Sequence, residues 1–239
     1  MDARRLAAED YRDWKGWSEV RDPDPLVAEG YALDLARAGV EPGARLLELG
    51  FGGGGFLRWA REQGYAVAGF ELDDELARRA QEAGFEATSG DLDALRAGWE
   101  RGGFDAVVAF DVLEHLEPDP LVETLGALRE LLRPGGVIVA RVPNGGSPFG
   151  RYYQHGDVTH KTALTSSLCE QLGRLAGLEL VRFDNAARPW RRGRRRLLRL
   201  LSYGSRTLIE RAVGYLYFHE RLPLDPNAVV VWRACGSSG

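Results

Sequence analysis

The sequence predicts an α/β protein built on a doubly wound, mostly parallel sheet of seven strands, with helices on both faces and an antiparallel last strand. From residue 44 onward, short apolar segments alternate with segments whose apolar residues recur at helical spacing. This alternation is typical of repeated strand–helix units. A glycine-rich segment, residues 50–55, follows the first apolar segment directly. The length of 239 residues, 44% of them hydrophobic, suits one such domain with additions.

Residues 1–43 are predicted to form an N-terminal helical segment. Apolar residues at helical spacing indicate a helix over 26–36, and Glu41-Pro42-Gly43 indicates a turn before the first strand. The stretch upstream, residues 11–17, is rich in aromatic side chains. We interpret it either as a lid over a pocket or as a helix packed on the sheet.

The central domain is predicted to comprise residues 44–185 and 227–235. Its strands are expected at 44–49, 66–71, 85–89, 104–110, 136–142, 178–184 and 228–232. Its helices are expected near 54–63, 73–83, 91–98, 119–132 and 164–176. Because the strands are short and largely apolar, both faces of the sheet should be covered by helices.

Residues 186–226 are predicted to be a helical insertion, because a simple connection between two strands needs only a few residues. The insertion begins with a basic cluster: residues 188–199 hold seven arginines and no acid, in a chain whose net charge is −4. Apolar residues at 197–218 indicate a helix after it. A local basic cluster on an acidic chain indicates an anionic partner. A solvated basic helix packed on the domain is the alternative interpretation.

The glycine-rich segment, which we call the glycine turn, fits two ligand patterns. Gly50, Gly52 and Gly55 satisfy the G-x-G-x-x-G dinucleotide pattern, with Glu71 about twenty residues further on. Gly50, Gly52 and Gly54 also form an acid-x-G-x-G-x-G pattern with Glu48 as the acid. The acid at the strand end favours the second pattern, because a carboxylate can bind a cationic amine.

Five blocks in register resemble the class I S-adenosylmethionine-dependent methyltransferases, most closely the branch of ubiquinone-biosynthesis-like and sugar methyltransferases. The blocks are residues 46–55, 69–73, 90–92, 104–116 and 132–144. The resemblance covers about residues 40–185 and the final strand. It implies a Rossmann-like fold, S-adenosylmethionine as cofactor, and an enzyme that transfers methyl groups. Phe51 and the extra glycines replace the more usual Cys-x-Thr/Ser-Gly of the turn.

The resemblance also implies roles for individual residues. Glu48 and the backbone of the glycine turn would hold the methionyl part of the cofactor, and Glu71 would bind the ribose hydroxyls. Asp91 would accept a hydrogen bond from the adenine amino group, although it could also cap the next helix. The residues expected to bind the cofactor are Glu48, Gly50, Phe51, Gly52, Gly54, Glu71, Leu72, Asp91, Leu92, Asp111 and Val112.

Methyl transfer to a hydroxyl needs a general base, which is most often a histidine. His115 follows the fourth predicted strand, and His155 and His160 lie in the loop after the fifth, at the same expected edge of the sheet. The residue types do not rank these three candidates. No metal site is expected, because no Asp-Asn pair accompanies Asp111 and Glu114 at the fifth strand.

The sequence therefore predicts an enzyme that transfers a methyl group from S-adenosylmethionine to a small-molecule or glycan-like acceptor, at a hydroxyl oxygen. An NAD(P)-dependent oxidoreductase and a non-catalytic S-adenosylmethionine-binding module are the alternatives. The expected acceptor is a small molecule or a lipid- or nucleotide-linked glycan. Residues 188–218 could contact a membrane peripherally, the chain could form a homodimer, and nucleic acid is not expected as a partner. A cytoplasmic location, at the inner membrane face if the insertion docks there, is expected because no signal peptide or long apolar run is present.

Overall fold

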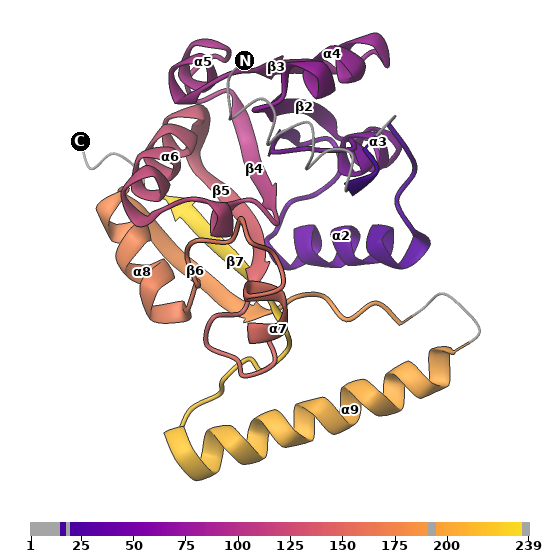
Figure 1. Cartoon of the computed structure of the whole chain (residues 1–239), viewed down its shortest axis with the longest axis vertical. Helices are drawn as coiled ribbons and strands as arrows, with labels where there is room; N and C mark the ends of the chain where they lie inside the picture. The colour runs from indigo at the N-terminus through magenta and orange to yellow at the C-terminus, as the bar shows by residue number, and fades with distance from the viewer. Residues whose placement is uncertain (1–14, 18–19, 191–194, 236–239) are drawn as a thin grey trace.

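A seven-stranded sheet forms the centre of the computed structural model, which describes residues 15–17, 20–190 and 195–235 (Figure 1). The strand order is β3-β2-β1-β4-β5-β7-β6. Strand β7 pairs antiparallel with both β5 and β6, and all other pairs are parallel. The strands are β1 (Arg45–Leu49), β2 (Ala66–Glu71), β3 (Glu86–Ser89), β4 (Phe104–Phe110), β5 (Leu132–Pro143), β6 (Leu178–Asn185) and β7 (Asn227–Ala234). The predicted sheet, including its antiparallel last strand, is confirmed.

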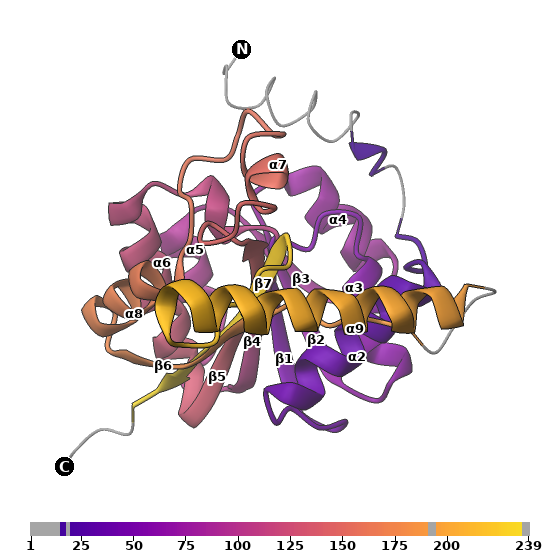
Figure 2. The same ribbon diagram turned by 90° about the horizontal axis from the view of Figure 1, so that it is seen from below.

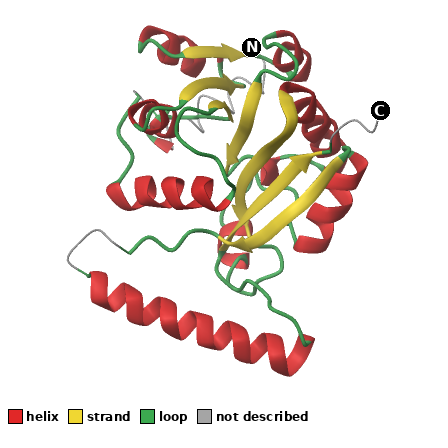
Figure 3. Cartoon of the chain, turned by 180° about the vertical axis from the view of Figure 1, so that it is seen from behind, coloured by secondary structure: helices red, strands yellow, loops and turns green. Residues whose placement is uncertain are grey.

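Helices cover both faces of the sheet (Figure 3). One face carries α2 (Pro25–Arg37), α3 (Gly55–Glu62) and α4 (Asp74–Glu82). The other face carries α5 (Leu92–Ala97), α6 (Pro118–Leu131) and α8 (Ser166–Leu175). Leu46 and Val108 point to the first layer, and Leu47 and Val107 to the second, because successive side chains of a strand alternate between faces. All four are fully buried, which explains the continuous apolar runs of the central strands.

Side-chain caps fix where several helices begin. The Asp73 carboxylate accepts from the N–H groups of Glu75 and Leu76 at the start of α4. At the start of α5, Asp91 accepts from the N–H groups of Asp93 and Ala94. At the start of α8, the Thr165 hydroxyl accepts from the N–H of Leu168. Such caps satisfy N–H groups that the first turn leaves without partners. The caps of α4 and α5 directly follow β2 and β3, so these helices begin at the carboxyl edge of the sheet.

Two parts of the chain differ from the predicted boundaries. Strand β5 begins at Leu132, four residues early, because Leu132 already pairs with Phe104 before an irregularity in the register. Two short helices, α7 (Arg151–Gln154) and the 3-10 helix η1 (Leu113–His115), were not predicted. The helix predicted over 26–36 is present as α2, which packs Tyr31 and Leu35 between the sheet and α3.

The insertion contains a long helix, α9 (Arg196–Val213), which continues into a π-helix, η2 (Gly214–Phe218). This helix lies apart from the two helix layers and crosses the side of the molecule where the parallel strands end (Figures 1 and 2). Residues 191–194 of the arginine cluster, residues 11–14 of the aromatic stretch and the tail 236–239 lie outside the described residues. No helix in the described ranges is both long and apolar enough to span a membrane.

Candidate functional site

A cavity of about 790 Å³ opens at the carboxyl edge of the central strands. The glycine turn after β1 and the residues after β4 form its floor. Lys15 and Trp17 from the N-terminal segment, and Tyr152 and Asp157 from the loop after β5, form its walls. A cavity at this edge, between loops that follow parallel strands, is the usual ligand site of open α/β sheets.

The glycine turn requires glycine at three of its positions. Gly50, Gly52 and Gly54 have positive φ values of 67°, 49° and 68°, a conformation that costs glycine little. A Cβ atom on Gly50 would also lie 2.7 Å from Cγ2 of Val112. The indole of Trp17 packs equally closely on Gly52 and Gly53. The N-terminal segment therefore covers the glycine turn directly.

Two acids flank the glycine turn, Glu48 buried and Glu71 half-buried. Glu48 is 5% exposed, and its Oε2 has no hydrogen-bond partner among the described residues. Burial, with a smaller contribution from the charge of Glu71, raises the Glu48 pKa well above its usual range. Glu71 accepts hydrogen bonds from the N–H groups of Gly52 (2.8 Å) and Leu72 (2.7 Å), while burial raises its pKa. An unpartnered buried carboxylate is costly, so Glu48 Oε2 is suited to a cationic or hydrogen-bond-donating ligand.

An arginine in β5 crosses the back of the cavity. Arg141 forms an ion pair with Asp111, the residue that follows β4 and has a positive φ of 58°. Its guanidinium also lies 4.9 Å from the ring centre of Phe110, which stacks on Tyr31. Burial lowers the Arg141 pKa, but the bonded Asp111 carboxylate outweighs this and the net shift is upward. Arg141 is therefore a permanent cation that holds Asp111 in position.

A chain of hydrogen bonds reaches His115 from the loop after β5. The Thr159 hydroxyl donates to Asp157 Oδ1 (2.5 Å) and lies 2.8 Å from Nδ1 of His115. Burial raises the Asp157 pKa, but the hydrogen bonds from Thr159 outweigh it and lower the pKa to about 2. Because Asp157 is ionised and takes the single hydroxyl proton, Thr159 must accept from Nδ1–H of His115. This tautomer leaves the His115 lone pair on Nε2.

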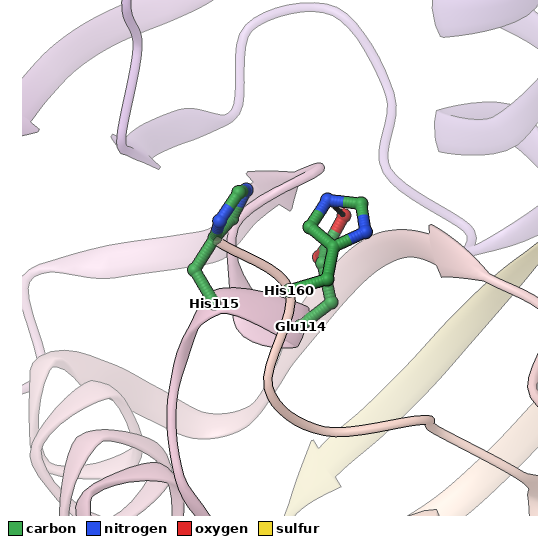
Figure 4. Close-up of side chains that lie close together, drawn as sticks. All are labelled: Glu114, His115 and His160. Carbon is green, nitrogen blue, oxygen red and sulfur yellow. Dashed lines mark ion pairs between the residues drawn. The ribbon is translucent and has the colours of Figure 1, made fainter. Parts of the chain in front are cut away.

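Glu114 and His160 lie beside His115 (Figure 4). Glu114 is 1% exposed, and neither its carboxylate oxygens nor Nδ1 of His160 has a hydrogen-bond partner in the described ranges. Nε2 of His160 lies 3.9 Å from Glu114 Oε1, and the two imidazole rings are 4.7 Å apart. Burial, with the charge of Asp111, raises the Glu114 pKa to about 8. Burial, with the charge of His160, lowers the His115 pKa.

Ligand atoms of Glu114, His115 and His160 lie within 4.8 Å of one another. One carboxylate and two imidazoles form a donor set that divalent transition metals accept. The sequence-based expectation of no metal site stays a prediction.

The structure brings part of the predicted site together at the cavity. Glu48, Gly50, Phe51, Gly52, Asp111, His115 and His160 line the cavity, while Gly54, Glu71, Leu72, Asp91, Leu92, Val112 and His155 do not. The Phe51 ring is buried against Gly69, so only its backbone faces the turn. Val112 supports Gly50 from behind. Asp91 caps α5, and His155 is exposed at the end of α7.

Several residues of the site were not among the predicted ones. Glu114 was considered only as a metal ligand, and Thr159 and Asp157, in the same loop as His160, were given no role. Arg141 could have been recognised from the sequence, because it is the single charged residue within the apolar run 137–142 of β5. Trp17 was part of a stretch interpreted as either a lid or a packed helix, and it lines the cavity.

Comparisons with known proteins agree on one family. The profile of the family described as Methyltransferase domain matches residues 26–206. A probable fatty acid methyltransferase of Mycobacterium tuberculosis is 30% identical over 169 residues, which cover 65% of this chain and 38% of that protein. A ubiquinone biosynthesis O-methyltransferase of Xanthomonas campestris is 35% identical over 131 residues, 51% of this chain and 54% of that protein. The chain thus spans between about a third and a half of these relatives.

A solved structure of an S-adenosylmethionine-dependent methyltransferase from Archaeoglobus fulgidus has the same fold. Its TM-score is 0.61 at 18% identity, and the match covers 85% of this chain and 94% of that chain.

Proposed function

Because the chain belongs to the methyltransferase domain family, we propose that it transfers a methyl group from S-adenosylmethionine to a hydroxyl oxygen of an acceptor bound in the cavity. Family membership confirms the resemblance to S-adenosylmethionine-dependent methyltransferases and favours the methyl donor over the nicotinamide dinucleotide that the glycine pattern alone also allowed. The hydrogen-bond chain from Asp157 through Thr159 to His115 carries the finer proposal of oxygen as the nucleophile.

The residues around the glycine turn fit the cofactor. Glu48 Oε2 is a buried acceptor that lacks a partner in the described part of the chain, and the cofactor's ammonium group would supply one. Glycine at positions 50 and 52 allows the positive φ values of the turn, which lines the cavity, while Val112 and Trp17 occupy the space that side chains there would need. Glu71, which already holds Gly52 N–H, would accept from the ribose hydroxyls. When bound, the cofactor supplies a methyl group on a positively charged sulfur.

His115 is the candidate base. Its Nδ1–H is held by Thr159, so Nε2 carries the lone pair that can accept the proton of an acceptor hydroxyl. Burial lowers the pKa of His115, which keeps it neutral near pH 7 and able to take that proton. Asp157 then stabilises the charge that forms on the imidazole, as the orienting acid does in other His-based catalytic chains.

We propose an apolar or lipid-like acceptor within the predicted class of small-molecule and lipid- or nucleotide-linked glycan acceptors. The names of the two curated relatives, which concern a fatty acid and ubiquinone biosynthesis, support this choice. The exposed aromatic side chains Tyr152 and Tyr153 at the cavity wall offer apolar surface to such a molecule.

The test is methyl transfer from S-adenosylmethionine carrying a labelled methyl group, with catechols, hydroxylated lipids and lipid-linked sugars as acceptors. We expect labelled ether products, and we expect His115→Gln to lower kcat by about 10²–10⁴-fold, the usual effect of removing a general base. Binding of S-adenosylhomocysteine should be unchanged in this variant. His155→Gln is the matched control, because His155 is exposed and outside the cavity wall.

Equal activity of the His115 and His155 variants would contradict the proposed base. Label transferred only to amines or carboxylates would contradict the hydroxyl acceptor. Binding of S-adenosylhomocysteine without any methyl product would favour the non-catalytic module.

A further inference from the structure

Helix α9 is attached to the domain through one side only. Tyr203, Thr207, Glu210 and Gly214 recur every three or four residues and are half-buried or buried, as are Arg199 and Val213 beside them. Arg188, from the chain after β6, donates to the Thr207 hydroxyl (2.8 Å) and to Glu210 Oε1 (2.6 Å). These contacts determine which side of α9 faces the protein.

The opposite side of α9 is apolar and exposed. At 3.6 residues per turn, Leu197, Leu201 and Leu208 lie opposite Tyr203 and Glu210, and each is more than 60% exposed. We call this side the outward face; its members are Leu197, Leu198, Leu201, Ser202, Gly204, Ser205, Leu208, Ile209 and Ala212. None of them is charged. The π-helix η2 adds exposed Tyr215, Leu216, Tyr217 and Phe218 at one end.

The charges bordering the outward face have one sign. By helical spacing, Arg195, Arg199 and Arg206 lie along one edge and Arg211 along the other. Arg206 is half exposed and also pairs with the buried Asp225, at 3.5 Å. The only acid between residues 195 and 218 is Glu210, which is 2% exposed and ion-paired with Arg188. In the described ranges, no acidic partner is found for Arg195 or Arg211. The exposed surface of α9 is therefore apolar in its middle and positive at its edges.

From this arrangement we propose that α9 and η2 dock the protein on an anionic lipid surface. An interfacial helix places its apolar side among the acyl chains and its arginines at the headgroups, where their long side chains reach the phosphates. Tyr215 and Tyr217 suit the same depth, because tyrosine has an apolar ring and a polar hydroxyl. The interaction does not depend on which acceptor the cavity binds.

A second copy of the chain is a poorer occupant of the outward face. In a two-fold symmetric dimer the same patch meets itself, so the arginines bordering α9 would approach those of the partner. No exposed acid on α9 is present to offset that repulsion. Anionic headgroups complement the arginines instead.

The docking surface and the cavity lie at the same edge of the sheet. Strand β6 runs parallel to β5, since both pair antiparallel with β7, so Asn185 and Pro143 end at the same edge. The chain leaves β6 at Asn185 to reach α9 and returns at Asn227, which lines the cavity. A docked α9 would thus bring the cavity's edge of the protein toward the lipid surface (Figure 2).

The proposal is tested by flotation of the full chain with phosphatidylcholine vesicles that contain or lack phosphatidylglycerol. We expect binding to the anionic vesicles that weakens with added salt. The double variant Leu201→Gln/Leu208→Gln should bind at least about tenfold more weakly, because two leucines no longer bury in lipid. Leu175→Gln is the matched control, since Leu175 is 72% exposed on α8, in a helix layer apart from α9.

A second variant, Arg195→Gln/Arg211→Gln, should remove most of the preference for anionic vesicles. Unchanged thermal unfolding and unchanged S-adenosylhomocysteine binding would show that the variants are folded. Vesicle binding that is absent in the natural chain, or equal in the α9 and Leu175 variants, would overturn the proposal. The proposal would also be overturned if the natural chain bound no vesicles but formed a dimer in sedimentation velocity, and if the α9 leucine variant were a monomer.

Discussion

Glu114 is a buried acid whose titration should make the free energy of unfolding depend on pH between about pH 4.5 and 8. Its folded pKa is raised from 4.5 to about 8, chiefly by burial. Below pH 4.5 both folded and unfolded chains hold the proton. Between about pH 4.5 and 8 only the folded chain holds it, so rising pH favours unfolding. Stability from this group is therefore present at acidic pH and lost as pH approaches 8.

We predict that Glu114→Gln removes this loss, because the amide has the same shape and no charge. Relative to the natural chain, the variant should gain on the order of a few kcal/mol between about pH 5 and about pH 8.5. Melting temperatures of both proteins at the two pH values provide the measurement. Asp34, whose pKa burial raises to about 6, titrates in both proteins and cancels in the difference. A pH-independent difference would contradict the prediction.

Residues that carry a strong chemical signal could be predicted, and residues that act through long-range contacts could not. His115 and His160 were predicted from their positions after strands, and the structure places both at the cavity. Thr159 reaches His115 across 44 residues of sequence, and Arg141 reaches Asp111 across 30. Residues so far apart follow no sequence-spacing rule, so the sequence alone could not predict that Thr159 contacts His115 or that Arg141 contacts Asp111.

At the level of elements, the glycine turn and the end of β2 form one unit. Glu71 Oε2 accepts from Gly52 N–H at 2.8 Å, and Gly50 N–H donates to Phe70 O at 2.7 Å. The carboxylate of Glu71 therefore holds the turn, and it lies at the strand end where we propose that the ribose binds. Apart from the start of β5, strand boundaries were predicted closely because buried apolar runs mark them. Helices α7 and η1 were not, because four and three residues carry no periodicity.

We predict that Glu71→Ala weakens S-adenosylhomocysteine binding by at least about tenfold, the effect of losing roughly 1.4 kcal/mol of charge-assisted hydrogen bonding. Isothermal titration calorimetry measures the affinity. Glu75→Ala is the control, because Glu75 is on the next helix and its side chain bonds Arg78 and Arg79 on that same helix. Equal affinities in the two variants would remove Glu71 from the cofactor site. A Glu71→Gln variant with near-normal affinity would indicate that holding the turn is its main role.

For the whole molecule, the alternation of strands and helices was sufficient to predict the sheet and its covering layers, and the length of the connection after β6 predicted a helix outside them. The position of α9 was not predictable, because it depends on a buried polar network between distant segments. Arg188 joins Glu210 on α9 to Asp225 before β7, and Asn185 bonds both Glu210 and the Asp225 N–H. The sequence analysis counted Arg188 with the basic cluster, whereas the structure shows it paired and largely buried. The division of the chain into three parts stays a prediction.

This network leads to a prediction about how the insertion is held. Arg188→Met would leave Glu210 and Asp225 with one fewer cation in a largely buried setting, and breaking such a pair typically costs about 3–5 kcal/mol. For a chain of this size, that corresponds to a melting temperature lower by roughly 10 °C. Arg206→Met is the matched control, because Arg206 also pairs with Asp225, at 3.5 Å, but its side chain is 48% exposed. An exposed pair contributes about 0–1 kcal/mol, so this variant should melt within a few degrees of the natural chain. Equal melting temperatures for the two variants would show that α9 is held chiefly by other contacts.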